Sequence, residues 1–459
     1  MTNSLTEKEA GRDKLERAVQ VLLVAYLIAI PFQRVWVFPL VQSRIQPPEI
    51  IFVPLFILST LYLLQNRQKL WFSPLDVGVL GWLGVNIFSG LHSGLSAYIV
   101  MDLIGTLYTT LVYFVVRLTI GQRLIKKLPD LIPLMSVIAA LFGIAGWCLL
   151  SLGVNNILMD EIDYYPFLGD IIGRAKAFTP TSGMLAGILL VGIVVKCADC
   201  WDKRKISRKD YLIIGVLLSG FFLTLSKTVI CLAIGSLLVW HFSSRKIVEL
   251  KQTILVWSAV LGLGILYIFN TYFLIAPIKA SFHPKLAQIF IAGDPSPILR
   301  WDSYQLIPTK YYVTLQANLF AIKESFPWGI GPGEFSRFSG EIDQKGLIIP
   351  LFSDSPAGGY FPHSTPLGTL SQLGLPGLIS VLFLWVLGGY GCYVGRRNKE
   401  NRGLAIGLTA SLIAISFSAI FTDVMRFRHA WWLLALVAVL WHSVRSLKES
   451  DNISQTKPD

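Results

Sequence analysis

Four short segments of the chain combine residue types that bind anions or move protons. The first runs from Gly173 to Thr181 and places Arg174 and Lys176 just ahead of an apolar stretch. Thr179 is a candidate N-cap, and Pro180 suits the first position of the helix that follows. Cations beside the free backbone N–H groups of a helix N-terminus form an anion site. The same two cations would also suit lipid phosphates at a membrane interface.

The second segment is Thr224-Leu225-Ser226-Lys227-Thr228, which joins two short apolar stretches. Each stretch has about 15 residues and would reach roughly 22 Å as a helix, less than the ~30 Å of a bilayer core. We therefore expect Lys227 to lie below the outer membrane surface, inside the protein. An ammonium at that depth is costly and by default functional. The alternative is a side chain that extends up to the surface.

The third segment, from Phe361 to Leu367, contains His363 at the mouth of an apolar stretch. Imidazole is the side chain best suited to proton transfer near neutral pH. The fourth place is the stretch that holds Arg300 and Lys310. Taken singly, a histidine at a membrane interface, such as His363, more often has a structural role than a catalytic one. Arg300 and Lys310, each taken singly, would more often be solvated surface charges than ligands of an anion.

Composition indicates that membrane helices position these segments. The chain has 459 residues, of which 53% are hydrophobic and 15% charged, with a mean hydropathy of +0.59. Soluble domains are about 25% charged, so a soluble enzyme, a disordered protein and a disulfide scaffold are excluded. We expect an all-α, polytopic integral membrane helical bundle of about 12 transmembrane helices, with a large, partly helical outer loop. The predicted spans lie near 18–34, 49–64, 75–91, 98–116, 131–152, 180–198, 211–225, 228–242, 253–273, 366–390, 404–422 and 430–446.

The distribution of cations predicts the orientation of this bundle. With the N-terminus in the cytoplasm, 26 of the 40 Lys and Arg residues lie inside, as the positive-inside rule requires. Both termini are then cytoplasmic. The resulting parts are an N-terminal bundle over 1–273, a large outer loop over 274–362, C-terminal helices over 363–446 and a cytoplasmic tail over 447–459.

The outer loop is too long to be structureless, so we expect it to fold. Thr309 is a plausible N-cap for a helix that extends to Phe326 and ends at Pro327. Its expected apolar stripe consists of Tyr311, Leu315, Leu319 and Ile322. A tight, glycine-rich turn follows at 329–333.

In the order of these motifs, the chain resembles the O-antigen ligase family, which also includes O-antigen polymerases and bacterial O-linked oligosaccharyltransferases. The resemblance covers residues 170–390. Lys227 stands where the family usually has Arg, and either Arg300 or Lys310 takes the place of the family's loop arginine. The matching segments are Arg174 to Pro180, Thr224 to Thr228, Pro327-Trp328-Gly329-Ile330-Gly331-Pro332-Gly333, and His363 with Gln372-Leu373-Gly374-Leu375-Pro376-Gly377-Leu378.

This resemblance implies a glycosyltransferase on the outer face of the plasma (inner) membrane. The donor would be a glycan on a polyprenyl diphosphate, and the acceptor a hydroxyl of a lipid, glycan or protein. His363 would take the proton of the acceptor hydroxyl, with inversion at the sugar carbon and with no metal, other cofactor or nucleic acid involved. The diphosphate would be held by Arg174, Lys176, Lys227, Arg300 and Lys310.

Two alternatives remain at this point. A repeat-unit polymerase of the same family shares the donor chemistry. A 12-span transporter of polysaccharide precursors belongs to a different class, and most such folds show two matching halves around a midplane site. An outer cavity near His363 would favour the enzyme.

Overall fold

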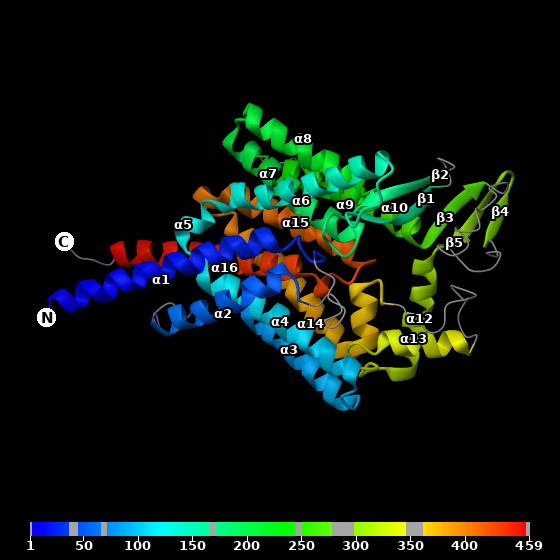
Figure 1. Cartoon of the computed structure of the whole chain (residues 1–459), viewed down its shortest axis with the longest axis horizontal. Coiled ribbons are helices and arrows are strands. Elements are labelled where there is room, and N and C mark those ends of the chain that lie inside the picture. The colour runs from blue at the N-terminus through cyan, green and yellow to red at the C-terminus, as the bar shows by residue number, and fades with distance from the viewer. Residues whose placement is uncertain are drawn as a thin grey trace.

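The computed structural model describes residues 2–35, 45–65, 71–165, 170–244, 250–277, 298–345 and 361–455. The structure is 77% helical, which agrees with the expected helical class. Figure 1 shows the helices running side by side, with both termini at one end of the molecule.

Eight helices among the described residues are long and apolar enough to cross a membrane, so the chain has the character of a multi-pass membrane protein. They are α2 (Pro47–Gln65), α3 (Pro74–His92), α4 (Ala97–Thr119), α6 (Leu128–Ser151), α7 (Ser182–Lys203), α10 (Leu250–Tyr272), α14 (Thr365–Gly395), and α15 (Arg402–Ala419) with the 3-10 turn η2 (Lys399–Asn401) before it. The count of twelve stays a prediction.

The other four predicted spans fall on helices outside this group of eight, which was identified over the described residues alone. These helices are α1 (Thr2–Ala29), α8 (Arg208–Leu223), α9 (Val229–Ser243) and α16 (Arg428–Gln455). As the sequence predicted, α8 and α9 are short, with 16 and 15 residues. A short helix α5 (Gln122–Ile125) joins α4 to α6.

Several helices begin at side chains that satisfy free backbone N–H groups. Ser73 caps α3 and forms a capping box with Asp76, and Ser207 does the same for α8 with Asp210. The N-cap of α7 is Thr181, so the prediction of Thr179 was wrong by two residues. The Thr179 hydroxyl instead contacts the carbonyl oxygens of Lys176 and Thr181 at 2.7 and 2.8 Å and so closes the turn before α7.

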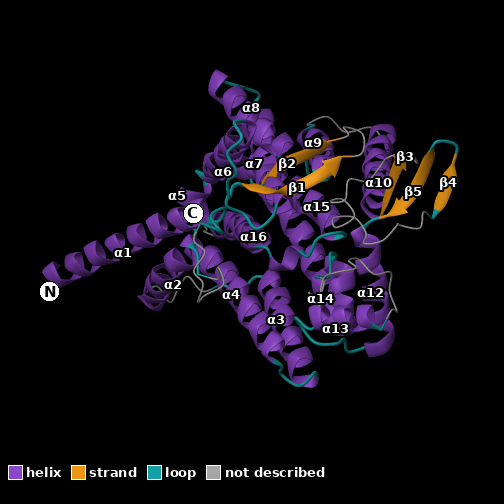
Figure 2. Cartoon of the chain, turned by 45° about the vertical axis from the view of Figure 1, so that its right-hand side comes forward, coloured by secondary structure: helices purple, strands orange, loops and turns teal. Residues whose placement is uncertain are grey.

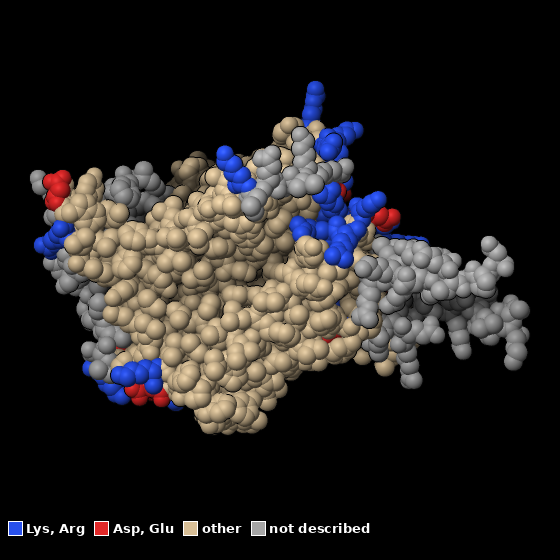
Figure 3. All heavy atoms as spheres, turned by 180° about the vertical axis from the view of Figure 1, so that it is seen from behind, with Lys and Arg blue, Asp and Glu red and all other residues tan. Residues whose placement is uncertain are grey.

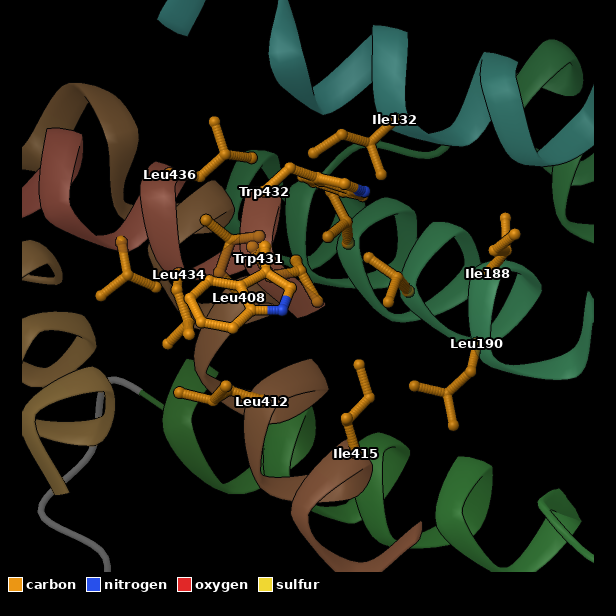
Figure 4. Close-up of a cluster of buried hydrophobic side chains, with 14 of the residues drawn as sticks. Ile132, Ile188, Leu190, Leu408, Leu412, Ile415, Trp431, Trp432, Leu434 and Leu436 are labelled. Atoms are coloured by element: carbon orange, nitrogen blue, oxygen red, sulfur yellow. The ribbon is translucent and has the colours of Figure 1, made fainter. Parts of the chain in front are cut away.

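Helix α7 lies at the centre of the bundle and packs against α6, α8, α9 and α15. Figure 4 shows a buried cluster to which α7 contributes Ile188 and Leu190, α15 contributes Leu408 and Leu412, and α16 contributes Trp431. A Cβ at Gly407 of α15 would lie 2.8 Å from Val195 Cα. Small residues at such contacts let two helix backbones approach closely.

Two small antiparallel sheets lie at the end of the molecule opposite the termini, and the sequence analysis did not predict them (Figures 1 and 2). The first pairs β1 (Met159–Tyr165) with β2 (Asp170–Ala175). The second has the strand order β3 (Phe273–Pro277), β5 (Tyr304–Pro308), β4 (Leu299–Trp301).

The same end carries α12 (Lys310–Ser325) and α13 (Phe335–Gln344). Thr309 caps α12 as predicted, but the predicted apolar stripe was wrong, since Leu319 is exposed. The buried side of α12 contains Val313, Ala317 and Ala321. Val313 and Ala317 belong to a small apolar cluster with Phe335 and Ile342 of α13, and α12 also contacts α14.

Charged side chains gather toward the ends of the molecule. Figure 3 shows a wide uncharged band across the middle of one face, with Lys and Arg on either side of it. Many large apolar side chains of the helices are exposed, among them Val53, Leu107, Leu261 and Val386. Such an exposed apolar belt is what contact with lipid requires.

Candidate functional site

His363 lies directly before α14, in a segment that this helix holds in place. Ser364 caps α14 by accepting a hydrogen bond from the Leu367 amide at 3.3 Å. The next residue, Thr365, donates to the Thr422 carbonyl oxygen at 2.8 Å and accepts from the Val424 amide at 2.9 Å. Both side chains are buried. The position of His363 is therefore fixed relative to the 420–427 loop.

Tyr311, in the first turn of α12, links His363 to Lys227. The rings of Tyr311 and His363 meet edge to face, with centroids 5.1 Å apart. On the same tyrosine, the Lys227 ammonium lies 5.8 Å from the ring centroid, within the range of a cation–π contact. Residues that are far apart in the sequence thus converge on one aromatic ring.

Lys227 is exposed, so the expectation that it lies inside the protein was wrong. Its ammonium donates to the carbonyl oxygen of Asn270 at 2.7 Å, near the C-terminus of α10. The carbonyl oxygens of Thr271 and Tyr272 accept hydrogen bonds from the Thr309 hydroxyl and amide, at 2.5 and 2.9 Å. A cation at this end of a helix interacts favourably with the helix dipole. In this structure Lys227 therefore has a capping role.

Arg174 connects the first predicted segment to the second. It lies on β2, and its Nε donates to the carbonyl oxygen of Thr224 at 3.1 Å. Lys176 follows the strand, and its amide donates to the Leu158 carbonyl oxygen at 2.9 Å. Arg174 at the end of β2 and Lys176 directly after it thus lie on the side of the bundle that carries the 224–228 turn.

The glycine-rich turn at 327–333 fits against a break in α14. Gly374 has a φ of 69°, outside helical values, and a Cβ there would overlap the Pro327 carbonyl oxygen. The break frees backbone groups of α14, and the turn pairs with them. The Ile330 and Gly331 amides donate to the carbonyl oxygens of Ser371 and Gln372, both at 2.9 Å, and the Leu375 amide donates to the Pro327 carbonyl oxygen at 2.8 Å. Non-helical backbone at membrane depth requires such partners.

A cavity of about 380 Å³ lies beside the beginning of α14. Three of the predicted segments contribute to its wall, through Pro180, Pro332 and Gln372. Much of the remaining wall comes from α4 between Met101 and Thr109, from the middle of α3 and from the 423–427 loop, and the first turns of α7 and α16 add Met184 and Arg428. The volume is at the lower end of the range for small-molecule sites.

The cavity contains a network of ion pairs that the sequence analysis missed. Arg426 pairs with Asp102 at 2.9 Å and with Asp423 at 3.0 Å, and Arg428 pairs with Glu49. Burial raises the pKa of the Asp423 carboxyl to about 6, against the opposing effect of Arg426 and with a contribution from Asp102. The available signal was the presence of Asp423, Arg426 and Arg428 in one short connection between two predicted spans.

Arg426 also connects the cavity to the histidine segment. Its guanidinium carbon lies 5.7 Å from the ring centroid of Phe361, two residues before His363. The site therefore has two neighbouring parts, which we call the tyrosine cluster (Lys227, Tyr311 and His363) and the arginine cavity. A series of pairwise contacts thus connects four of the predicted segments.

The two loop cations occupy different places. Lys310 is the first residue of α12 and the sequence neighbour of Tyr311. Arg300 lies on β4, opposite Gln305 of β5, in a strand whose residues are all exposed. Of the two, Lys310 is the one whose backbone adjoins the tyrosine cluster.

The tyrosine cluster combines an imidazole, a phenol and an ammonium, which suits proton transfer next to an anionic group. Tyr311 was named in the sequence analysis only as part of an apolar stripe, so its bridging position was missed. Comparison with protein-family models and with curated proteins finds no match to this chain.

Proposed function

We propose that the protein is an O-antigen ligase-like glycosyltransferase of the outer face of the plasma membrane. It would move a glycan from a polyprenyl-diphosphate donor to an acceptor hydroxyl. The observation that carries the proposal is the Tyr311 ring, which contacts both the Lys227 ammonium and the His363 imidazole. A base next to a cation is what transfer from a diphosphate needs.

In the proposed reaction the acceptor oxygen attacks the anomeric carbon of the donor sugar. A bond forms between these two atoms while the bond from the carbon to the diphosphate oxygen breaks. His363 takes the proton of the acceptor hydroxyl, and the diphosphate leaves with the bonding electron pair. Arg174, Lys176 and Lys227 stabilise the charge that develops on it. One displacement inverts the anomeric carbon, and the scheme needs no metal.

The position of the arginine cavity supports an enzyme over a transporter. Its wall includes Met184 of α7, Thr369 of α14 and Arg428 of α16, which lie near helix N-termini that face outward in the predicted orientation, and it extends along α4 from Met101 to Thr109. A transporter with two matching halves would place its site at the midplane. A repeat-unit polymerase fits the same geometry, because ligase and polymerase differ in the acceptor.

The test is glycan transfer by purified protein in liposomes, with a lipid-diphosphate-linked glycan and an acceptor glycolipid. Lys227→Ala should lower transfer by about 10- to 100-fold, the value of a charge-assisted contact to phosphate. Lys227→Arg should retain substantial activity. The matched control is Lys323→Ala, which removes an exposed cation of α12 and should leave the rate unchanged.

Melting temperatures of the three variants separate a binding role from the capping role of Lys227. A Lys227→Ala protein that transfers glycan at the wild-type rate would refute its role as a phosphate ligand. Product length distinguishes the two family reactions, because a polymerase extends the glycan and a ligase moves it to the lipid acceptor.

A further inference from the structure

The arginine cavity differs in chemistry from the tyrosine cluster. Arg426 and Arg428 share the cavity wall with Asp102 and Asp423, and Glu49, which pairs with Arg428 from outside the wall, adds a third carboxylate to the network. Every charged side chain in the cavity wall is thus paired within the protein. An additional anion would enter a network that already has more acids than bases. The cavity therefore favours a neutral ligand over a phosphate.

The uncharged side chains of the wall supply hydrogen-bond acceptors. Thr109 and Thr369 donate their hydroxyl protons to carbonyl oxygens of their own helices, at 3.0 Å to Thr106 and 2.6 Å to Thr365. A hydroxyl that donates in this way still presents lone pairs to a ligand. The guanidinium of Arg426 supplies donors in the same cavity. The cavity wall thus offers hydrogen-bond donors and acceptors side by side. A ligand hydroxyl can both donate and accept a hydrogen bond, so it is complementary to such a wall.

Apolar surface accompanies these polar groups. Trp82 of α3 lines the cavity, as do Met184 and Leu373. An aromatic wall with a few placed polar groups is the usual composition of a small-molecule site. A sugar ring has the same two characters, with hydroxyls around its edge and C–H groups on its faces.

We infer that the arginine cavity binds one sugar residue, through its hydroxyls, next to the tyrosine cluster. This inference rests on the proposed function for its choice of a glycan, while the sugar site itself is defined by the cavity wall. The donor and the acceptor both carry such a residue. The contact between Arg426 and Phe361 places this sugar beside the segment that holds His363.

Gly105 of α4 offers a variant that fills the cavity. It lines the cavity, and a Cβ added there meets no atom within 4 Å, so the backbone position leaves open space in which the side chain of Gly105→Leu begins. Gly81 of α3 also has open space around its Cβ and is exposed, but it is not in the cavity wall. Gly81→Leu is therefore the matched control.

The experiment measures the melting temperature of the purified full chain in detergent. The probes are methyl glycosides of glucose, galactose, mannose, rhamnose and N-acetylglucosamine, with inorganic phosphate as the contrasting anion. At least one glycoside should raise the melting temperature by roughly 1–3 °C at saturation. The rise should be lost in Gly105→Leu and retained in Gly81→Leu and His363→Gln. Any effect of phosphate should be the same in Gly105→Leu as in the wild type.

The sugar site would be refuted if a glycoside still raised the melting temperature of Gly105→Leu. It would also be refuted if none of the glycosides raised the melting temperature of the wild type. A phosphate effect that only Gly105→Leu removes would likewise refute it. The melting-temperature experiment measures sugar binding and does not depend on glycan transfer. The proposed transferase function can therefore be refuted while the sugar site is confirmed, and the sugar site can be refuted while the transferase function is confirmed. Trapping with a photoreactive sugar on the donor or on the acceptor then shows which of the two supplies the bound residue.

Discussion

At the scale of single residues, Asp423 determines how the arginine cavity responds to pH. Its carboxyl lies 3.0 Å from Arg426, and burial raises its pKa to about 6. In an unfolded chain an aspartate has a pKa of about 3.9. The folded state therefore holds this proton more tightly than the unfolded state does. Its contribution to stability is full below about pH 4 and is lost as the pH rises through about 6.

Replacing Asp423 by Asn should remove this part of the pH dependence. The wild type should lose melting temperature between about pH 5 and about pH 8, and Asp423→Asn should lose less. The control is Glu324→Gln, which neutralises an exposed carboxylate of α12 and should leave the difference unchanged. An equal or larger loss in Asp423→Asn would contradict the raised pKa.

At the scale of elements, the contact between the 327–333 turn and the break in α14 holds two motifs together. Gly374→Ala should destabilise the fold by more than the roughly 1–3 kcal/mol that a residue other than glycine costs at its φ of 69° and ψ of −162°, because the new Cβ also overlaps the Pro327 carbonyl oxygen. Gly389→Ala, in the same helix and with open space around its Cβ, should be neutral or slightly stabilising. Melting temperatures in detergent measure both. Equal effects would show that the break in α14 is not required.

A second element-scale prediction concerns the pairing of α3 with α4. Arg117 of α4 lies 2.9 Å from Asp76 of α3, both side chains are buried, and the Tyr113 hydroxyl donates to the same carboxylate at 2.8 Å. Asp76→Ala leaves a buried charge unpaired and should cost about 3–5 kcal/mol. The exposed pair of Lys126 and Glu400 provides the control, since Glu400→Gln should cost less than about 1 kcal/mol. Comparable losses in the two variants would argue against a buried ion pair.

Helix caps and apolar spans were predictable because they depend on local sequence. Thr309 and Pro327 defined α12 to within a residue or two. The partners of each element were not predictable, because they depend on contacts between distant segments. Leu319 is exposed, and Val313 and Ala317 of α12 pack with Phe335 and Ile342 of α13 instead. Likewise, the pairing of Asp102 with Arg426 joins two segments that are far apart in the sequence, so it required the fold.

At the scale of the whole molecule, the predicted orientation places both termini in the cytoplasm and the tyrosine cluster outside. Figure 1 shows the termini at the end opposite the two small sheets. An impermeant thiol reagent should label Lys345→Cys in intact cells and Lys205→Cys only after permeabilisation. Both positions are exposed, and the exposed native Cys148 must first be replaced by Ser. Labelling of Lys205→Cys in intact cells would reverse the orientation.

The measurement that tests the central claim most directly is the transfer rate of His363→Gln against pH, in liposomes with lipid-linked donor and acceptor. A general base contributes about 10²–10⁴-fold, so the variant should lose that much activity at an unchanged membrane level. His241→Gln, which alters a histidine near the end of α9, is the control and should keep the wild-type rate. The wild-type rate should also fall toward acid, because a protonated imidazole cannot accept a proton. Near-wild-type transfer by His363→Gln, or a rate that rises toward acid, would contradict the account.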